Sequence, residues 1–218
     1  MQFNQPLALS EESQAFIGRQ LLRFDAITAD MPTTRGSAVA KQDRNQLGVS
    51  DASFIYGEIS FQSFAEVFEL VKSRHGGLPA NGVFYDLGSG TGKAVVAAAL
   101  LHEFEYCRGI ELLEGLFQAS LELKTAYEQE GGGPRVEFIH GDLLTYDWSD
   151  ASCLFVNSTC FSEQLMRHIA HAWVHPGTIA ITSSKNLKSP QWRVLEVIHR
   201  PMSWGGATLY VQQCVEEQ

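Results

Sequence analysis

A glycine-rich turn directly after a short apolar run constrains this chain more than any other feature. The run at residues 82–85 is typical of a buried strand, and it leads into the segment DLGSGTG at residues 86–92. The small apolar residues at 93–101 then predict a helix. Because glycine lacks a side chain, such a turn lets a ligand lie against the backbone. The order strand, turn, helix therefore predicts a site for a nucleoside-bearing cofactor.

The spacing within this turn separates three classes of cofactor. A phosphate-binding P-loop needs a glycine where this chain has Leu87 and a Ser or Thr where it has Ala94. A dinucleotide site needs G-x-G-x-x-G, whereas the order here is D-x-G-x-G-x-G. Asp86 would repel a pyrophosphate but suits the cationic methionine head group of S-adenosylmethionine. The turn would then be formed by Gly88, Gly90 and Gly92. A tight turn that binds no ligand is the alternative.

Two further segments carry acidic residues where such a cofactor would need them. Glu111 follows an expected strand at 106–110, about 20 residues after the glycine turn, where a carboxylate can accept hydrogen bonds from both ribose hydroxyls. Asp142 and Leu143 follow an expected strand at 135–140. They would offer an acceptor to the adenine amino group and an apolar wall to its ring. A plain Gly-Asp turn is equally consistent with that last segment.

The composition is that of an ordinary globular domain. The chain has 218 residues, of which 44% are hydrophobic, so it can bury a substantial core. Its four cysteines are scattered without a C-x-x-C pair, which argues against a disulfide framework or a cysteine-rich zinc site. The amino terminus lacks a signal-peptide pattern, and no apolar run approaches the roughly 20 residues that span a bilayer. We therefore expect a soluble, intracellular protein without a membrane contact.

The alternation of expected strands and helices predicts an α/β fold. Ser10 can cap a helix that runs to about Asp30, and residues 31–53 are expected to be loop. Further helices are expected at 61–74, 93–101, 113–129 and 163–173, and strands at 82–86, 106–110, 135–140, 152–157, 177–183, 192–200 and 208–215. The result is a doubly wound, mainly parallel seven-stranded sheet with an antiparallel carboxy-terminal strand. Residues 1–53 would form an added amino-terminal helix and loop, and residues 54–218 the cofactor-binding domain.

These motifs resemble the class I S-adenosylmethionine-dependent methyltransferases. The resemblance rests on residues 86–92, 109–111 and 141–142. Four more segments are similar to the DOT-type (disruptor of telomeric silencing) histone lysine methyltransferases. They are residues 56–61, 155–161 and 183–185, and residues 203–204 ahead of Tyr210. The resemblance covers roughly residues 54–213.

The DOT-type resemblance implies roles for individual residues. Tyr56 and Glu58 would fold over S-adenosylmethionine, and Asn157 would lie beside the transferred methyl group. Tyr210 would help to wall a lysine channel, for which Phe155, Phe161 and Trp204 are also candidates, although ordinary core packing explains the phenylalanines equally well. The chain departs from the family at Lys93, a cofactor-binding position where Gln is usual, and at Ser158, where a second Asn is usual.

The chemistry implied is methyl transfer to a neutral amine, with S-adenosylhomocysteine as the product. Burial of a lysine head group in an apolar channel disfavours its charged form, so no dedicated base and no metal are needed. Two histidines on one helical face are able to bind zinc, and His168, His171 and His175 have suitable spacing. We favour a structural role for them, with His175 near a helix carboxyl end.

We therefore expect a protein lysine N-methyltransferase whose substrate, by resemblance, is a core histone or nucleosome. The alternatives are methylation of a non-histone protein or small amine, and a catalytically silent cofactor-binding module. The chain has 16 Lys plus Arg against 25 Asp plus Glu, a net charge of -9, so bare DNA should bind weakly. Nucleosome recognition would then depend on histone surface or on a basic partner protein. The resemblance suggests a nuclear location and leaves the cytoplasm open, and the oligomeric state is unassigned.

Overall fold

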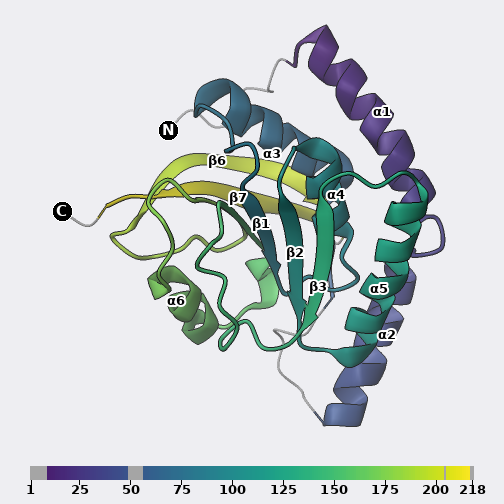
Figure 1. The fold of residues 1–218 in the computed structure, drawn as a ribbon. Helices are drawn as coiled ribbons and strands as arrows, with labels where there is room; N and C mark the ends of the chain where they lie inside the picture. The colour runs from purple at the N-terminus through teal and green to yellow at the C-terminus, as the bar shows by residue number, and fades with distance from the viewer. Residues whose placement is uncertain (1–8, 49–55, 204, 217–218) are drawn as a thin grey trace.

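The protein is built around one seven-stranded sheet (Figure 1). The computed structural model describes residues 9–48, 56–203 and 205–216. The sheet order is β3-β2-β1-β4-β5-β7-β6, and only β7 runs against its neighbours. The strands are β1 Val83–Leu87, β2 Tyr106–Glu111, β3 Arg135–His140, β4 Cys153–Val156, β5 Ile179–Ser183, β6 Trp192–Met202 and β7 Gly205–Cys214. The predicted mainly parallel, doubly wound sheet with an antiparallel carboxy-terminal strand is confirmed.

The helices cover the two faces of the sheet unequally. They are α1 Glu11–Thr28, α2 Thr33–Leu47, α3 Phe61–Arg74, α4 Lys93–Leu101, α5 Glu114–Gln129 and α6 Glu163–His171, with a 3-10 turn at Ser158–Cys160. One core contains Phe84 and Cys107 of the sheet together with apolar residues of α1, α3, α4 and α5. The other contains Tyr85 and Leu154 together with residues of α6. Neighbouring strand residues thus alternate between two cores, as expected of a sheet buried on both faces.

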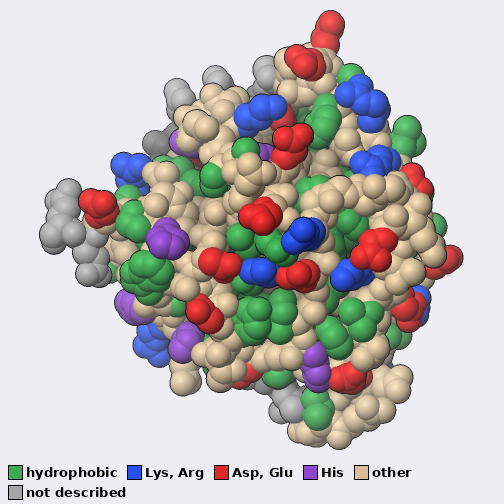
Figure 2. All heavy atoms as spheres, viewed as in Figure 1, with side chains coloured by type: hydrophobic (Ala, Val, Ile, Leu, Met, Phe, Trp, Pro, Cys, Tyr) green, Lys and Arg blue, Asp and Glu red, His purple; other side chains and the backbone are tan. Residues whose placement is uncertain are grey.

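Part of the sheet face that carries β2 and β3 is charged, and no helix of the described residues covers it. Residues 141–152, which connect β3 to β4, form turns. Arg108 on β2 pairs with Glu137 at 2.8 Å and Asp150 at 3.0 Å, and its guanidinium lies 4.4 Å from the centre of the Tyr106 ring. Figure 2 shows acidic and basic side chains interleaved over this face. On this part of the sheet the charges of the strand side chains pair with one another, and no crossover helix of the described chain buries them.

The loop predicted for residues 31–53 is wrong over Thr33–Leu47, which form α2. Residues 49–53 lie outside the described residues. Pro32 and Gly36 suggested a broken segment, but Pro32 is the N-cap of α2, a position that tolerates proline. Gly36 is a packing residue, because a Cβ there would lie 2.5 Å from the Tyr56 ring. A tertiary contact therefore explains Gly36, whereas Pro32 is explained by its place at the start of the helix.

α2 supplies the polar cap that α5 lacks in its own sequence. The N-cap of α5, Leu113, has no side chain that can accept a hydrogen bond from the first turn. Instead the carboxylate of Asp43 on α2 accepts the backbone N–H of Gly115 at 2.8 Å. A Cβ on Gly115 would lie 2.7 Å from that carboxylate, so glycine permits the close approach. The amino-terminal helices are thereby joined to the edge of the cofactor-binding sheet.

Asp43→Ala is expected to lower the free energy of unfolding by about 1 kcal/mol, because an N-terminal N–H of α5 loses its acceptor. Denaturant titration followed by circular dichroism measures the change. The matched control is Asp25→Ala, since Asp25 is an exposed residue of α1 and its loss should change stability by less than about 0.5 kcal/mol. Equal stability of the two variants would contradict the capping role.

Candidate active site

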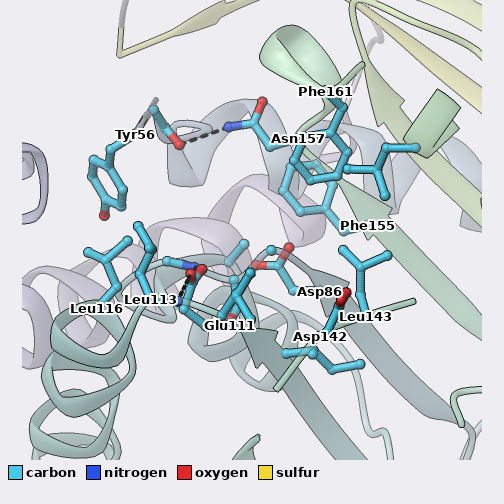
Figure 3. A pocket seen from close by; sticks show the side chains of 18 of the residues that line it. Tyr56, Asp86, Glu111, Leu113, Leu116, Asp142, Leu143, Phe155, Asn157 and Phe161 are labelled. Atoms are coloured by element: carbon cyan, nitrogen blue, oxygen red, sulfur yellow. Dashed lines mark hydrogen bonds between the residues drawn. The ribbon is translucent and has the colours of Figure 1, made fainter. Parts of the chain in front are cut away.

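A cavity of about 430 Å³ opens at the carboxyl ends of the first strands (Figure 3). Ligands of open α/β sheets bind at this edge, and the volume lies in the range of about 300–1,000 Å³ seen for small-molecule sites. Five segments line it. They are residues 56–59, the glycine turn after β1, residues 110–116, residues 141–144 after β3, and residues from 155 to 168 around β4 and α6. All three predicted cofactor segments are thus brought together.

The glycines of the turn have different roles in this cavity. Gly88 and Gly90 line it, and Gly90 has a φ of 56°, which favours glycine. A Cβ on Gly90 would also lie 2.7 Å from the Tyr56 ring. Gly92 is not among the lining residues, and a Cβ there would lie 2.3 Å from the ring of Phe138. Gly92 therefore allows the turn to pack against β3 instead of against a ligand.

Asp86 is a buried carboxylate at the floor of the cavity. Its side chain is 3% exposed, and its Oδ1 atom has no hydrogen-bond partner among the described residues. Burial, and secondarily the nearby Glu111, raises the pKa of Asp86 well above its usual range. Buried polar atoms are almost always hydrogen-bonded, so an orphaned acceptor at a cavity wall fits a ligand that supplies donors or positive charge.

Glu111 is held in place by the backbone. Its Oε2 atom accepts the N–H of Gly90 and its Oε1 atom accepts the N–H of Leu113, each at 2.8 Å. Burial raises the pKa of Glu111, while these two N–H groups act in the opposite direction. Each carboxylate oxygen can accept a second hydrogen bond. The side chain can therefore shape the glycine turn and still receive two hydroxyl groups from a ligand.

Asp142 and Leu143 lie beside each other at the far end of the cavity (Figure 3). The Oδ1 atom of Asp142 accepts the N–H of Leu144 at 2.9 Å, which fixes the turn after β3. Its second oxygen has no hydrogen bond to any described residue. The assignment of Asp142 to the adenine amino group and of Leu143 to the face of its ring stays a prediction.

The segment at residues 56–59 covers the cavity and is tied to α2 and α4 through one carboxylate. Glu58 accepts hydrogen bonds from the Tyr56 hydroxyl, from Thr33 at 2.6 Å and from Lys93 at 2.9 Å. The Tyr56 hydroxyl also contacts Thr91 at 2.7 Å. Burial, followed by the charge of Glu58, raises the pKa of Tyr56, so the phenol keeps its proton and donates it. Glu58 is therefore engaged by the protein itself, although it lines the cavity together with Tyr56 and Lys93.

Asn157 is fixed on both sides of its amide. Its Nδ2 atom donates to the Gly57 carbonyl at 2.8 Å (Figure 3), and its Oδ1 atom accepts the Ser183 hydroxyl at 2.7 Å. These bonds connect the cover segment to the ends of β4 and β5. Ser158, the next residue, is fully buried and donates to the carbonyls of Ser183 and Lys185. The family departure at Ser158 therefore lies outside the cavity lining.

The residues predicted to wall a lysine channel are not gathered in one lining. Phe155 and Phe161 line the main cavity. Tyr210 lies instead in a second cavity, on the α6 side of the sheet. Trp204 lies outside the described residues. The predicted role of Tyr210 in the channel stays a prediction.

Several lining residues escaped the sequence patterns. Leu113, Leu116 and Leu165 are apolar positions of expected helices, and nothing in their spacing marked them as ligand contacts. His168 also lines the cavity, on α6.

Among residues 9–48, 56–203 and 205–216 there is no group of three His, Cys, Asp or Glu side chains that could hold a metal ion, and the four cysteines are free thiols. No helix of the described chain is long and apolar enough to cross a membrane.

Comparison with known families gives one match that covers most of the chain. A family model described as "Histone methylation protein DOT1" matches residues 41–197. This range includes all five segments that line the main cavity. Curated protein sequences give no match.

Solved structures share the fold. An RNA methyltransferase from Salinibacter ruber in complex with S-adenosyl-L-homocysteine is 23% identical, with a TM-score of 0.52 over 72% of this chain and 92% of that chain. A variant of MtNAS in complex with S-adenosylmethionine is 11% identical, with a TM-score of 0.56 over 94% and 97% of the two chains. TrmK, a tRNA methyltransferase from B. subtilis, is 16% identical, with a TM-score of 0.51 over 73% and 67%. At these identities the likeness establishes a Rossmann-like fold and no more.

Proposed function

Because the chain belongs to the DOT1 family of histone methylation proteins, we propose that it transfers a methyl group from S-adenosylmethionine to a lysine side chain of a protein. Membership of the family makes the chain a methyltransferase, and the acceptor is the part that we propose. A core histone is the first substrate to test, and a nuclear location would follow from it. The observation that best supports S-adenosylmethionine as the cofactor is the buried carboxylate of Asp86 at the cavity floor, whose Oδ1 atom has no partner among the described residues.

The acidic residues that line the cavity support one arrangement of S-adenosylmethionine. Asp86 would receive its ammonium group, and Glu111 would receive the two ribose hydroxyls. Asp142 and Leu143 would contact the adenine. Two of the structures that share the fold contain this cofactor or its demethylated product, which supports the same assignment. Lys93 is the only lysine or arginine that lines the cavity among the described residues, and beside its ion pair with Glu58 it would receive the carboxylate of the methionine moiety.

For this reaction the protein must align the acceptor amine with the methyl group and exclude water from the site. The bound cofactor would supply a sulfonium methyl group, which reacts by in-line displacement. Both ends of the Asn157 amide are hydrogen-bonded, which restricts its rotation, so Asn157 would present a fixed edge to the reacting centre. Phe155 and Phe161 provide apolar walls that disfavour the charged form of an entering lysine. A neutral amine is thereby obtained without a dedicated base.

The alternative of a catalytically silent module rested on Lys93 and Ser158. In the structure Lys93 forms an ion pair with Glu58, and Ser158 points into the loop after β5. Neither residue displaces Asn157 from the cavity. The geometry therefore favours an active enzyme over a silent module.

Transfer of a labelled methyl group tests the proposal directly. The protein is incubated with methyl-labelled S-adenosylmethionine and, separately, with histone octamers, nucleosomes, a histone-depleted lysate and total RNA. We expect label in protein, and acid hydrolysis should recover it as methyl-lysine. Asp86→Asn should abolish the labelling. Label in RNA alone would reject the lysine assignment, and cofactor binding without any labelling would indicate a silent module.

Binding of S-adenosylmethionine is expected to release protons. Burial gives Asp86 a raised pKa in the free protein, and an ammonium group beside it would lower that pKa, so the carboxyl loses its proton on binding. Calorimetry in buffers of different ionisation enthalpy measures the release. The release should decrease as the pH rises through the raised pKa of Asp86, and it should be absent in Asp86→Asn. Proton uptake at neutral pH would contradict the assignment.

A further inference from the structure

A second cavity of about 240 Å³ lies between α6 and the loop after β5. Its walls come from the amino-terminal half of α6, from the residues that follow β5, and from β7. The lining residues are Glu163, Met166, Arg167, Ser184, Lys185, Asn186, Lys188 and Tyr210. Three cations face a single carboxylate, so the cavity is locally basic in a chain whose net charge is -9.

The polar groups of this cavity are largely unused within the protein. Of the 16 lysines and arginines, 12 have a hydrogen-bond or ion-pair partner among the described residues. The four without one are Arg19, Lys41, Arg167 and Lys188, and the last two line the cavity. The side chains of Asn186 and Tyr210 also have no partner in the described chain.

The remaining cation of the cavity is only loosely neutralised. Lys185 lies 3.8 Å from Glu163, and the Glu163 side chain is 65% exposed. An exposed ion pair of this kind contributes little free energy, so an incoming anion can compete with Glu163. Lys185 also donates to the Phe161 carbonyl. The cavity therefore presents donors and positive charge with few internal acceptors.

The second cavity adjoins the proposed reacting centre. Phe161 lines the main cavity, and its carbonyl is the acceptor for Lys185 of the second. Ser184, which lines the second cavity, directly follows Ser183, whose hydroxyl donates to Asn157. A group held in the second cavity would thus lie one short segment away from the acceptor site.

We propose that this cavity binds the carboxylate of an acidic side chain of the protein substrate, near the lysine that is methylated. This inference rests on the proposed function. A carboxylate accepts charge-assisted hydrogen bonds from Arg and Lys, and the donors present match that chemistry. The small volume suits one compact anion. A phosphodiester chain would need a longer basic track than Arg167, Lys185 and Lys188 provide, and the acidic remainder of the chain repels it.

The second cavity would make the enzyme selective for lysines that have an acidic residue nearby in the substrate. Arg167 and Lys188 would repel a further lysine of a basic tail and attract an aspartate or glutamate at the matching distance from the acceptor. Since these two side chains lie outside the main cavity, they act on substrate binding and leave the transfer step unchanged. The signature is a change in KM with little change in kcat.

Paired peptides test this selectivity. Each peptide has one lysine and carries either Glu or Gln at successive positions on both sides of it. In the wild-type protein at least one Glu peptide should have a KM about tenfold lower than its Gln partner. In the double variant Arg167→Gln/Lys188→Gln the ratio of the two KM values should fall to about one. The matched control Arg19→Gln/Lys41→Gln removes the same two kinds of unpartnered charge from α1 and α2 and should keep the wild-type ratio.

Inorganic phosphate probes the cavity without any methylation. In backbone amide NMR spectra, phosphate should shift residues 184–188 saturably in the wild type and in the control variant, but not in Arg167→Gln/Lys188→Gln. Equal Glu-to-Gln ratios in the wild type and the double variant would overturn the proposal. RNA methylation that depends on Arg167 and Lys188 would also overturn it. Phosphate shifts without methylation of any peptide or protein would reject the proposed function and the protein substrate, while leaving the anion site itself in place.

Discussion

Glu111→Ala is expected to weaken binding of S-adenosylmethionine by ~1–3 kcal/mol, a loss of about five- to 150-fold in affinity. Two effects add. The variant removes the carboxylate that would receive the ribose hydroxyls through charge-assisted hydrogen bonds. It also leaves the buried N–H groups of Gly90 and Leu113 without their acceptor, so the glycine turn loses a hydrogen bond that holds its conformation. Isothermal titration calorimetry measures the affinity, and S-adenosylhomocysteine should show the same loss because its ribose is unchanged.

Two further variants separate these effects. Glu111→Gln keeps the side-chain volume but cannot accept at both positions, so it should bind more weakly than the wild type and more tightly than Glu111→Ala. Glu103→Ala removes an exposed carboxylate that precedes β2, at the opposite edge of the sheet, and should bind normally. Unaltered binding by Glu111→Ala, or tighter binding of NAD than of S-adenosylmethionine by the wild type, would remove the cofactor assignment.

The parts of the fold that were predictable from sequence are those set by local pattern. α3, α4 and β3 have the predicted limits, and the start of α1 follows its Ser10 cap, which accepts the N–H of Ser13. Apolar periodicity and capping residues suffice in these segments, because burial and local hydrogen bonding favour the same structure. The antiparallel pairing of β6 and β7 followed from the short connection between them.

α2 was missed because its stability comes from elsewhere in the chain. Its apolar stripe is weak, and it contains Gly36 and follows Pro32. Only the structure shows that Gly36 accommodates the Tyr56 ring and that Asp43 caps α5. These contacts join residues far apart in sequence, so no local pattern could reveal them.

In the candidate site too, some residues could be predicted from local sequence pattern and others depend on contacts between distant segments. Asp86, Glu111 and Asp142 could be expected at one edge of the sheet, because each lies at or near the carboxyl end of a parallel strand. The network around Glu58 could not be expected, since it depends on Thr33 of α2 and on the fold of the cover segment. Tyr210 could be placed on a strand but not in a particular cavity, because the loop after β5 decides which cavity its side chain lines.

Asn157→Ala is expected to lower kcat by about 100-fold while changing the affinity for S-adenosylmethionine little. Through its two hydrogen bonds, the Asn157 amide joins the cover segment to the ends of β4 and β5. Its loss frees the Gly57 carbonyl and the Ser183 hydroxyl, and a displacement of about 1 Å at a reacting centre costs a factor of that size. Glu111 is held by the N–H groups of Gly90 and Leu113, and neither it nor Asp86 has a hydrogen bond to Asn157, so the residues that would hold the cofactor should stay in place.

A series of variants shows whether Asn157 acts through the position of its amide in the site or only through the stability of the protein. Ser183→Ala removes one of the two restraints on the Asn157 amide, so kcat should fall by less than in Asn157→Ala. Asn157→Asp keeps the acceptor for Ser183 but sets a carboxylate against the Gly57 carbonyl, so it should not restore turnover. Asn45→Ala changes an exposed residue of α2 and should behave as the wild type. Single-turnover rates and cofactor titrations are measured on each variant, and stability is checked by thermal unfolding. A folded Asn157→Ala protein that turns over at the wild-type rate would show that Asn157 is not at the reacting centre. Activity that follows stability across the series would show that Asn157 acts only through the fold.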